Sequence, residues 1–165
     1  MQKLLFILFT IFIISPAYSE IISGKALVID GDTIKIDSNK IRLFGIDAPE
    51  KKQKCKKIFL SIYIFSFDKS YDCGTISTNK LKNKIKDHTV TCKSKGKDRY
   101  KRIIAECFKN KTNLNLWLVR NGYAVAYTKY SKKYLPEQNL AKKENKGLWR
   151  GQFEMPWDWR KKNKL

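Results

Sequence analysis

The sequence contains few of the residues that build transition-metal sites or linkers between domains. Its 165 residues include a single histidine, His88, and its four cysteines form no C-x-x-C pair. A zinc site needs several such ligands close together, so zinc is the weaker explanation of the cysteines. The chain has no internal repeat and no long Gly/Ser-rich or Pro-rich stretch. Nothing therefore marks a boundary between two domains.

Long apolar runs are also absent, except at the start of the chain. Lys3 precedes an apolar run of eleven residues over 4–14, and Pro16 and the small-residue pattern Ala17-Tyr18-Ser19 follow. This order is typical of a secretory signal, and the run is shorter than the roughly 20 residues of a membrane-spanning helix. We predict a signal peptide over residues 1–19 and one mature domain over 20–165, secreted or periplasmic. The alternative is an uncleaved N-terminal anchor.

Acidic residues are scarce, with 15 Asp and Glu against 35 Lys and Arg and a formal net charge of +20. Removal of Lys3 with the signal would leave 34 basic residues and a charge of about +19. Such an excess attracts polyanions, first nucleic acid and then anionic lipid or cell-wall polymer. Only 6 of the 35 basic residues are Arg, so a compositional drift toward Lys, Ile and Asn explains part of the excess.

The four cysteines indicate two disulfides, because an even number in an exported chain is usually paired. Cys92 and Cys107 lie on predicted strands joined by the basic hairpin "KSKGKDRYK". Cys55 and Cys73 bracket an irregular segment over 51–73, which is basic at first and then apolar and aromatic. We therefore predict the pairs Cys55–Cys73 and Cys92–Cys107.

Hydrophobic periodicity predicts a small α+β domain of mainly β character. Period-two alternation and turn residues indicate five short strands in antiparallel order, and apolar residues at helical spacing indicate about three packed helices. Such a set of short strands suggests a small closed barrel. The predicted strands cover 26–29, 33–37, 41–46, 89–93 and 102–108, and the predicted helices cover 75–86, 113–122 and 136–145.

Five of the 15 acidic residues fall in the short stretch "IDGDTIKIDSNKIRLFGIDAPE" over 29–50. Asp30 and Asp32 lie at a turn between strands, and Asp47 and Glu50 lie just past a strand end. Carboxylates that meet at a barrel mouth repel each other unless a cation lies between them. Oxygen-only ligands suit Ca²⁺ or Mg²⁺. The alternative is that Asp30 and Asp47 only form turns.

Arg42 lies on the strand between these acids. It could simply pair with Asp47. If a phosphodiester binds nearby, the same guanidinium becomes a two-pronged clamp on phosphate.

The sequence resembles the staphylococcal-nuclease-like (thermonuclease) family, because it contains the acidic stretch over 29–50 and further motifs of that family. The likeness is carried by "DGDT", "IRLFGIDAPE", "DRYKR" over 98–102, "NLNLWLVRNGYAVAY" over 113–127 and "LPEQNLAKKENKGLW" over 135–149. The ending "GLWRGQFEMPWDWR" and the four cysteines look like the exported bacterial branch. The resemblance implies a five-stranded OB-type barrel that hydrolyses phosphodiester bonds of DNA and RNA with Ca²⁺, leaving 3′-phosphate ends. We predict a monomer.

The resemblance assigns a role to each matching position. The metal ligands would be the side chains of Asp32 and Asp47 and the backbone carbonyl of Ala48. Glu50 would act on the attacking water, and Arg42 and Arg102 would stabilise the phosphate. Tyr127 would lie beside the nucleotide, with Tyr100 as a second candidate for that place.

The sequence departs from the family pattern at three places. One is the segment over 51–73, which is longer and more apolar than expected after the "APE" motif. Lys101 stands where the family has Gly, and Lys129 stands where a second nucleotide-binding tyrosine is expected, with Tyr130 one residue late. Members without catalysis usually lack the acids or arginines, which are all present here. The alternatives are a non-catalytic OB-fold module that binds nucleic acid or polyanions at the cell envelope, and an envelope structural protein. The presence of the acid cluster favours a catalytic nuclease over these two alternatives.

Overall fold

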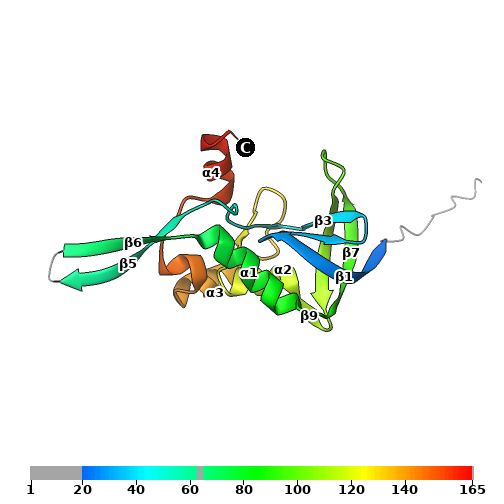
Figure 1. Ribbon diagram of the computed structural model, residues 1–165, viewed down its shortest axis with the longest axis horizontal. Helices are drawn as coiled ribbons and strands as arrows, with labels where there is room; N and C mark the ends of the chain where they lie inside the picture. Colours follow the sequence, from blue (N-terminus) through cyan, green and yellow to red (C-terminus); the bar gives the residue numbers. More distant parts are fainter. Residues whose placement is uncertain (1–19, 63–64, 165) are drawn as a thin grey trace, which may run out of the picture.

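The computed structural model describes residues 20–62 and 65–164 (Figure 1). The signal peptide predicted over residues 1–19 lies outside this part of the chain. Among the described residues, no helix is both long and apolar enough to cross a membrane. The described chain forms a barrel with helices packed against it, and a long hairpin extends away from the barrel (Figure 1).

Five strands form the barrel, in the order β3-β2-β1-β7-β8. Neighbours in this order run antiparallel, and β3 then pairs with β8 in parallel to close the sheet. The all-antiparallel order expected from the sequence is wrong for this closing pair. No tight turn joins β3 to β8, so the long connection between them allows a parallel arrangement. The strands are β1 (Ile21–Asp30), β2 (Thr33–Ile36), β3 (Asn39–Leu43), β7 (Thr89–Lys97) and β8 (Ile103–Lys109).

Alternating apolar residues explain how these strands enclose a core. Ile34 and Ile36 are completely buried, whereas Lys35 between them is exposed. Residues two apart on a strand point to the same side, so the isoleucines line the barrel interior. Helix α1 (Cys73–Ile85) packs Leu81 and Ile85 into the same core.

Further short elements extend the barrel. The side chain of Asn113 caps helix α2 (Leu114–Arg120) by accepting a hydrogen bond from the N–H of Leu116 at 3.0 Å. The other elements are β4 (Ile46–Asp47), β9 (Thr112–Asn113), β10 (Val125–Ala126), α3 (Leu135–Lys143), the 3-10 helix η1 (Gly147–Arg150), β11 (Gly151–Gln152) and α4 (Pro156–Lys162). The sequence patterns indicated α1, α2 and α3, but not α4.

The segment over 51–73, which was expected to be irregular, is mostly a β-hairpin. Strands β5 (Cys55–Ile62) and β6 (Phe65–Tyr71) pair antiparallel, and β11 adds to the outer side of β5. The hairpin projects from the barrel in Figure 1. The apolar run "IFLSIYIFSF" has little alternation between apolar and polar residues, so the period of a strand was not visible in the sequence.

Two disulfides are present, with the pairing that the sequence predicts. Cys92 and Cys107 lie directly opposite each other on β7 and β8, inside the barrel core. Cys55 and Cys73 connect the first residue of β5 to the first residue of α1. The second bond therefore fastens the base of the hairpin to the barrel.

Candidate active site

The turn between β1 and β2 is built by Asp30 and Gly31 and places Asp32. Asp30 Oδ1 accepts a hydrogen bond from the backbone N–H of Asp32 at 3.0 Å, a local bond that favours Asp in turns. A Cβ at Gly31 would lie 2.4 Å from Ser77 Oγ and 2.6 Å from the Ala48 Cβ. Only glycine therefore allows the turn to pack this closely against α1 and the end of β4. Asp32 is buried beneath this turn.

Arg42 joins the two aspartates into one cluster. Strand β3 pairs with β2 so that Arg42 lies opposite Thr33, next to Asp32. Its Nη1 donates to Asp32 Oδ1 at 2.6 Å, and its Nη2 donates to Asp47 Oδ1 at 2.5 Å. The backbone N–H of Ala48 donates to Asp32 Oδ2 at 2.6 Å. The β1–β2 turn, β3 and the end of β4 thus meet at a single ionic cluster.

Burial makes the negative charges in this cluster costly. Asp47 is 0% exposed. Burial, followed by the nearby charge of Asp32, raises the pKa of Asp47 to about 6, and the same causes raise the pKa of Asp30 to about 6. Burial disfavours the charge of Arg42 as well, but the two aspartates around it raise its pKa above the usual value. Cations beside the aspartates therefore stabilise their ionised form.

The free oxygen sites of Asp32 and Asp47 fit a hard cation. Asp32 Oδ2 accepts a hydrogen bond from Ala48, and Asp47 Oδ2 accepts one from Arg160 of α4. An ionised carboxylate oxygen has about two acceptor sites, so each oxygen keeps one. Within residues 20–62 and 65–164, no three His, Cys, Asp or Glu side chains are grouped to hold a metal. A cation here would need backbone or water oxygens as well, which Ca²⁺ readily takes.

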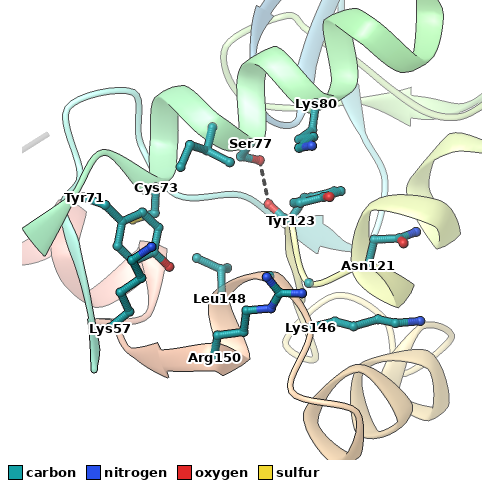
Figure 2. Close-up of a pocket in the computed structure, with 13 residues that line it drawn as sticks. Lys57, Tyr71, Cys73, Ser77, Lys80, Asn121, Tyr123, Lys146, Leu148 and Arg150 are labelled. Atoms are coloured by element: carbon teal, nitrogen blue, oxygen red, sulfur yellow. Dashed lines mark hydrogen bonds between the residues drawn. The ribbon is translucent and has the colours of Figure 1, made fainter. Parts of the chain in front are cut away.

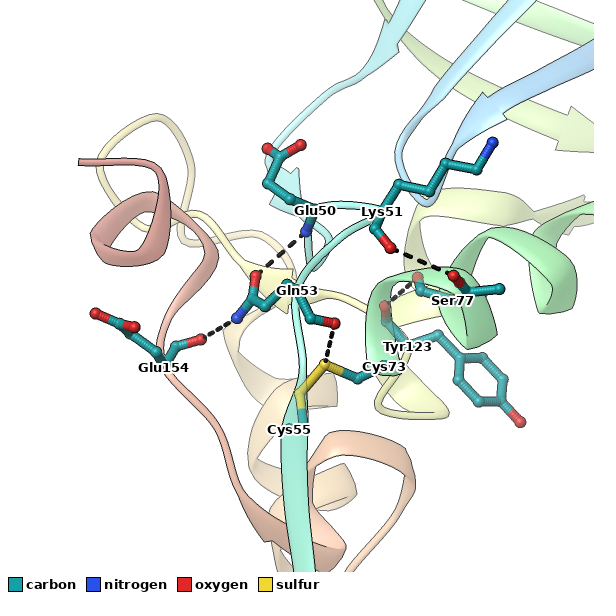
Figure 3. The surroundings of a disulfide bond; sticks show 9 residues. Glu50, Lys51, Gln53, Cys55, Cys73, Ser77, Tyr123 and Glu154 are labelled. Carbon is teal, nitrogen blue, oxygen red and sulfur yellow. Dashed lines mark hydrogen bonds between the residues drawn. A yellow bond between two sulfur atoms is a disulfide. The ribbon is translucent and has the colours of Figure 1, made fainter. Parts of the chain in front are cut away.

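Glu50 lies on a loop that is held from two sides (Figure 3). Its backbone N–H donates to Gln53 Oε1 at 3.2 Å, and Gln53 Nε2 donates to the carbonyl of Glu154 at 2.7 Å. Gln53 is buried, and its own carbonyl lies 3.4 Å from the sulfur of Cys73 in the disulfide with Cys55. The loop of Glu50 is thus fixed beside the segment that leads into α4.

Arg102 directly precedes β8, the strand that pairs with the strand of Arg42. The parallel register pairs Arg42 with Ile104, and Arg102 lies two residues before Ile104, just ahead of the start of the same strand. Asp98 holds Arg102 by bonds from Nε at 2.7 Å and from the backbone N–H at 3.0 Å. Lys101 has φ 62°, the conformation for which glycine is favoured, and the Asp98–Arg102 contacts form despite it.

The tyrosines expected at the nucleotide lie in different surroundings. Tyr127 follows β10, whose Val125 pairs with Asp47, so Tyr127 adjoins the acid cluster. Burial and then Asp47 raise the pKa of Tyr127. Tyr130 packs edge-on against Tyr127 with ring centroids 4.8 Å apart. Tyr100 is 63% exposed and packs against the guanidinium of Arg102.

Comparison with known proteins identifies the family. Residues 40–151 match the sequence model of the family described as Staphylococcal nuclease homologue. The chain belongs to this family. It is accordingly a hydrolytic nuclease, and its closed barrel with packed helices is the OB-type fold that the sequence predicts. The matched region contains Arg42, Asp47, Glu50 and Arg102. It begins after Asp32 and ends before α4.

Relatives from three bacteria match most of the nuclease chain. An uncharacterized endonuclease of Escherichia coli is 36% identical over 154 residues, or 88% of this chain and 89% of its own. The succinoglycan biosynthesis protein ExoI of Rhizobium meliloti (strain 1021) is 35% identical over 139 residues, or 82% of this chain and 69% of its own. An uncharacterized endonuclease of Haemophilus influenzae is 34% identical over 144 residues, which are 82% of this chain and 71% of its own.

Arg160 is a residue of the ionic cluster that the sequence patterns did not indicate. Its Nη1 donates to Asp47 Oδ1 at 3.0 Å and to Glu50 Oε1 at 2.7 Å, and its Nη2 donates to Asp47 Oδ2 at 2.8 Å. It lies 113 positions from Asp47 in the sequence. The available signal was "MPWDWR", because Pro often starts a helix, and Trp157 and Arg160 would then share a face.

A separate cavity of about 380 Å³ lies between α1, η1 and β5 (Figure 2). Lys57, Lys80, Lys146 and Arg150 line it, and the described lining residues include no Asp or Glu. Ser77 donates a hydrogen bond to the carbonyl of Tyr123 at its edge. Asp32, Asp47 and Glu50 do not border this cavity, so the phosphodiester hydrolysis predicted from the sequence is assigned to the ionic cluster.

Proposed function

We propose that this nuclease requires Ca²⁺ and hydrolyses phosphodiester bonds in both DNA and RNA, leaving 3′-phosphate ends. The observation that carries the proposal is the buried pair Asp32 and Asp47, bridged by Arg42. Two buried carboxylates held this close need positive charge, and a phosphodiester adds negative charge. Their remaining oxygen sites suit Ca²⁺.

The cation would be held by the side chains of Asp32 and Asp47 and by the backbone carbonyl of Ala48. When bound, Ca²⁺ supplies positive charge to a phosphate oxygen as negative charge develops during the reaction. The chain itself keeps the ligands aligned, because Arg42 and the Ala48 N–H hold the carboxylates in place.

Arg42 and Arg102 would bind the phosphate while staying anchored. A guanidinium has five N–H donors. Arg42 uses two of them on Asp32 and Asp47, and Arg102 directs two nitrogens to Asp98, so both retain donors for phosphate oxygens. Donors fixed before the reaction stabilise developing charge without reorganisation.

Glu50 would serve as the general base. Its carboxylate takes a proton from water while the water oxygen forms a bond to phosphorus. The bond from phosphorus to the 5′ oxygen breaks, and that oxygen takes a proton from solvent, which leaves the phosphate on the 3′ side. General-base catalysis contributes a factor of roughly 10² to 10⁴.

Cleavage of both nucleic acids follows from what the site contacts. The arginines would bind phosphate oxygens, and the ring of Tyr127 would stack on the face of a base. DNA and RNA share both features. The names of the relatives from E. coli and H. influenzae agree with cuts inside a strand. The net charge of +20 would draw either polymer to the protein.

The proposed enzyme is a monomer made of one mature domain over 20–165, located outside the cytoplasm in the periplasm or medium. The two disulfides support this location, because such bonds persist in oxidising compartments.

The direct test incubates the purified mature domain with plasmid DNA and with RNA, each with Ca²⁺, Mg²⁺ or chelator. We expect cleavage of both with Ca²⁺, poor cleavage with Mg²⁺, which demands near-ideal octahedral geometry, and none with chelator. Full cleavage in chelator would refute the calcium requirement. Tight binding without cleavage at any Ca²⁺ concentration would instead favour a non-catalytic binding module.

A further inference from the structure

Helix α4 carries two side chains into the proposed active site from outside the region matched by the family. Trp157 and Arg160 are three residues apart and therefore lie on neighbouring positions of one helix face. Arg160 reaches Asp47 and Glu50, and Trp157 reaches Tyr127. Each contact engages a residue that the proposed function assigns to the cation, the water or the nucleotide.

The guanidinium of Arg160 supplies positive charge where a divalent cation would. It bonds to both oxygens of Asp47 and to one oxygen of Glu50. The charges of Asp32, Asp47 and Glu50 sum to −3, and Arg42 and Arg160 reduce this sum to −1. A bound Ca²⁺ would bring the sum to +1 with Arg160 in place and to 0 without it. The two cations therefore repel each other across the same carboxylates.

Trp157 covers one face of Tyr127. The two rings are stacked with centroids 5.1 Å apart and an interplanar angle of 5°. A nucleobase stacks on a tyrosine in the same parallel way. The face of Tyr127 that Trp157 occupies is thus closed to a base while α4 stays in this position.

The attachment of α4 suits a helix that can be displaced. It has seven residues, and helices this short are not stable in isolation, so its place depends on its contacts. The hydrogen bond from Gln53 to Glu154 and the burial of Pro156 fix the point where the helix begins. Trp157 also packs against the buried cluster that contains Val125 and Leu148, so displacement of the helix would break this contact while the preceding segment remains attached.

We propose that α4 is an internal latch, in which Arg160 competes with the divalent cation for Asp47 and Trp157 competes with a nucleobase for Tyr127. The cation and the nucleic acid open the latch by taking these two places. Opening frees Glu50 from Arg160, so that the carboxylate can accept a proton from water. This inference rests on the proposed function and adds a means of regulating the same site.

The test measures Ca²⁺ binding by titration calorimetry in the absence of nucleic acid. The proteins compared are the wild-type mature domain, Arg160→Gln, Trp157→Ala and the control Lys161→Gln. The control removes one positive charge from an exposed position on the same helix. We expect Arg160→Gln to bind Ca²⁺ about tenfold more tightly than the wild type. This ratio corresponds to a wild-type protein in which the latch is closed in about nine of ten molecules. Trp157→Ala should shift the affinity in the same direction, and Lys161→Gln should match the wild type.

A second readout follows the helix itself. The fluorescence of Trp157, obtained as the difference between the wild type and Trp157→Phe, should change on addition of Ca²⁺ because stacking on Tyr127 is lost. Equal Ca²⁺ affinities in all four proteins, or weaker binding by Arg160→Gln, would overturn the latch and make Arg160 a support of Glu50. Absence of Ca²⁺ binding in every protein would refute the calcium requirement of the proposed function and the latch with it.

Discussion

Replacement of Arg42 by methionine should destabilise the protein far more than the loss of an exposed ion pair. Methionine keeps most of the side-chain volume but removes both hydrogen bonds, to Asp32 and to Asp47. The carboxylates of these residues are 3% and 0% exposed, so water cannot replace the lost donors. Asp47 would still have Arg160, whereas Asp32 would keep only the N–H of Ala48 and the hydroxyl of Thr33.

The magnitude follows from leaving one buried charge without its partner. Breaking a buried ion pair on one side costs about 3 to 5 kcal/mol. We expect the lower end, about 3 kcal/mol, because Asp32 keeps two neutral hydrogen-bond donors. The matched control is Arg120→Met, which breaks ion pairs with Glu137 and Glu144 at the surface. Such pairs contribute little, so its loss of stability should be much smaller.

The free energy of unfolding would be measured by urea denaturation at pH 7 in chelator, monitored by circular dichroism. Adding Asp32→Asn to Arg42→Met should restore part of the loss, since the unpaired charge is then removed. Equal losses for Arg42→Met and Arg120→Met, or no recovery in the double variant, would show that the cluster is not held together by these charges.

Three further outcomes are expected from single sites. Glu50→Gln should lower turnover by roughly 10² or more while nucleic-acid affinity persists, and unchanged turnover would exclude Glu50 as the base. Lys101→Gly should raise the free energy of unfolding by about 1 kcal/mol, because the positive φ no longer strains a side chain, with activity changed only a few-fold. A hundredfold gain in activity would instead reveal a damaged site. Replacing Cys92 and Cys107 by serine opens a loop of separation 15 and should lower the free energy of unfolding by about 3 kcal/mol in urea titrations.

The sequence alone determined the elements whose signals are local. Ile34 and Ile36 alternate with exposed residues, so β2 could be recognised from period two. Asn113 and Gly122 mark the limits of α2 through capping and positive φ, which depend on neighbouring residues only. The motifs that hold Asp32, Asp47 and Glu50 are also continuous stretches, so these residues could be selected from the sequence.

The tertiary structure decided how distant segments meet. Arg160 lies 110 positions from Glu50, and no local pattern encodes their contact; it depends on where the chain after η1 passes the barrel. The parallel pairing of β3 with β8 brings the strand that follows Arg102 alongside the strand that carries Arg42, and this register is set by closure of the whole sheet. Capping and periodicity act over a few residues, whereas charge pairing, ring stacking and sheet closure act wherever folding brings groups together. The cluster and its covering helix are for that reason properties of the folded barrel.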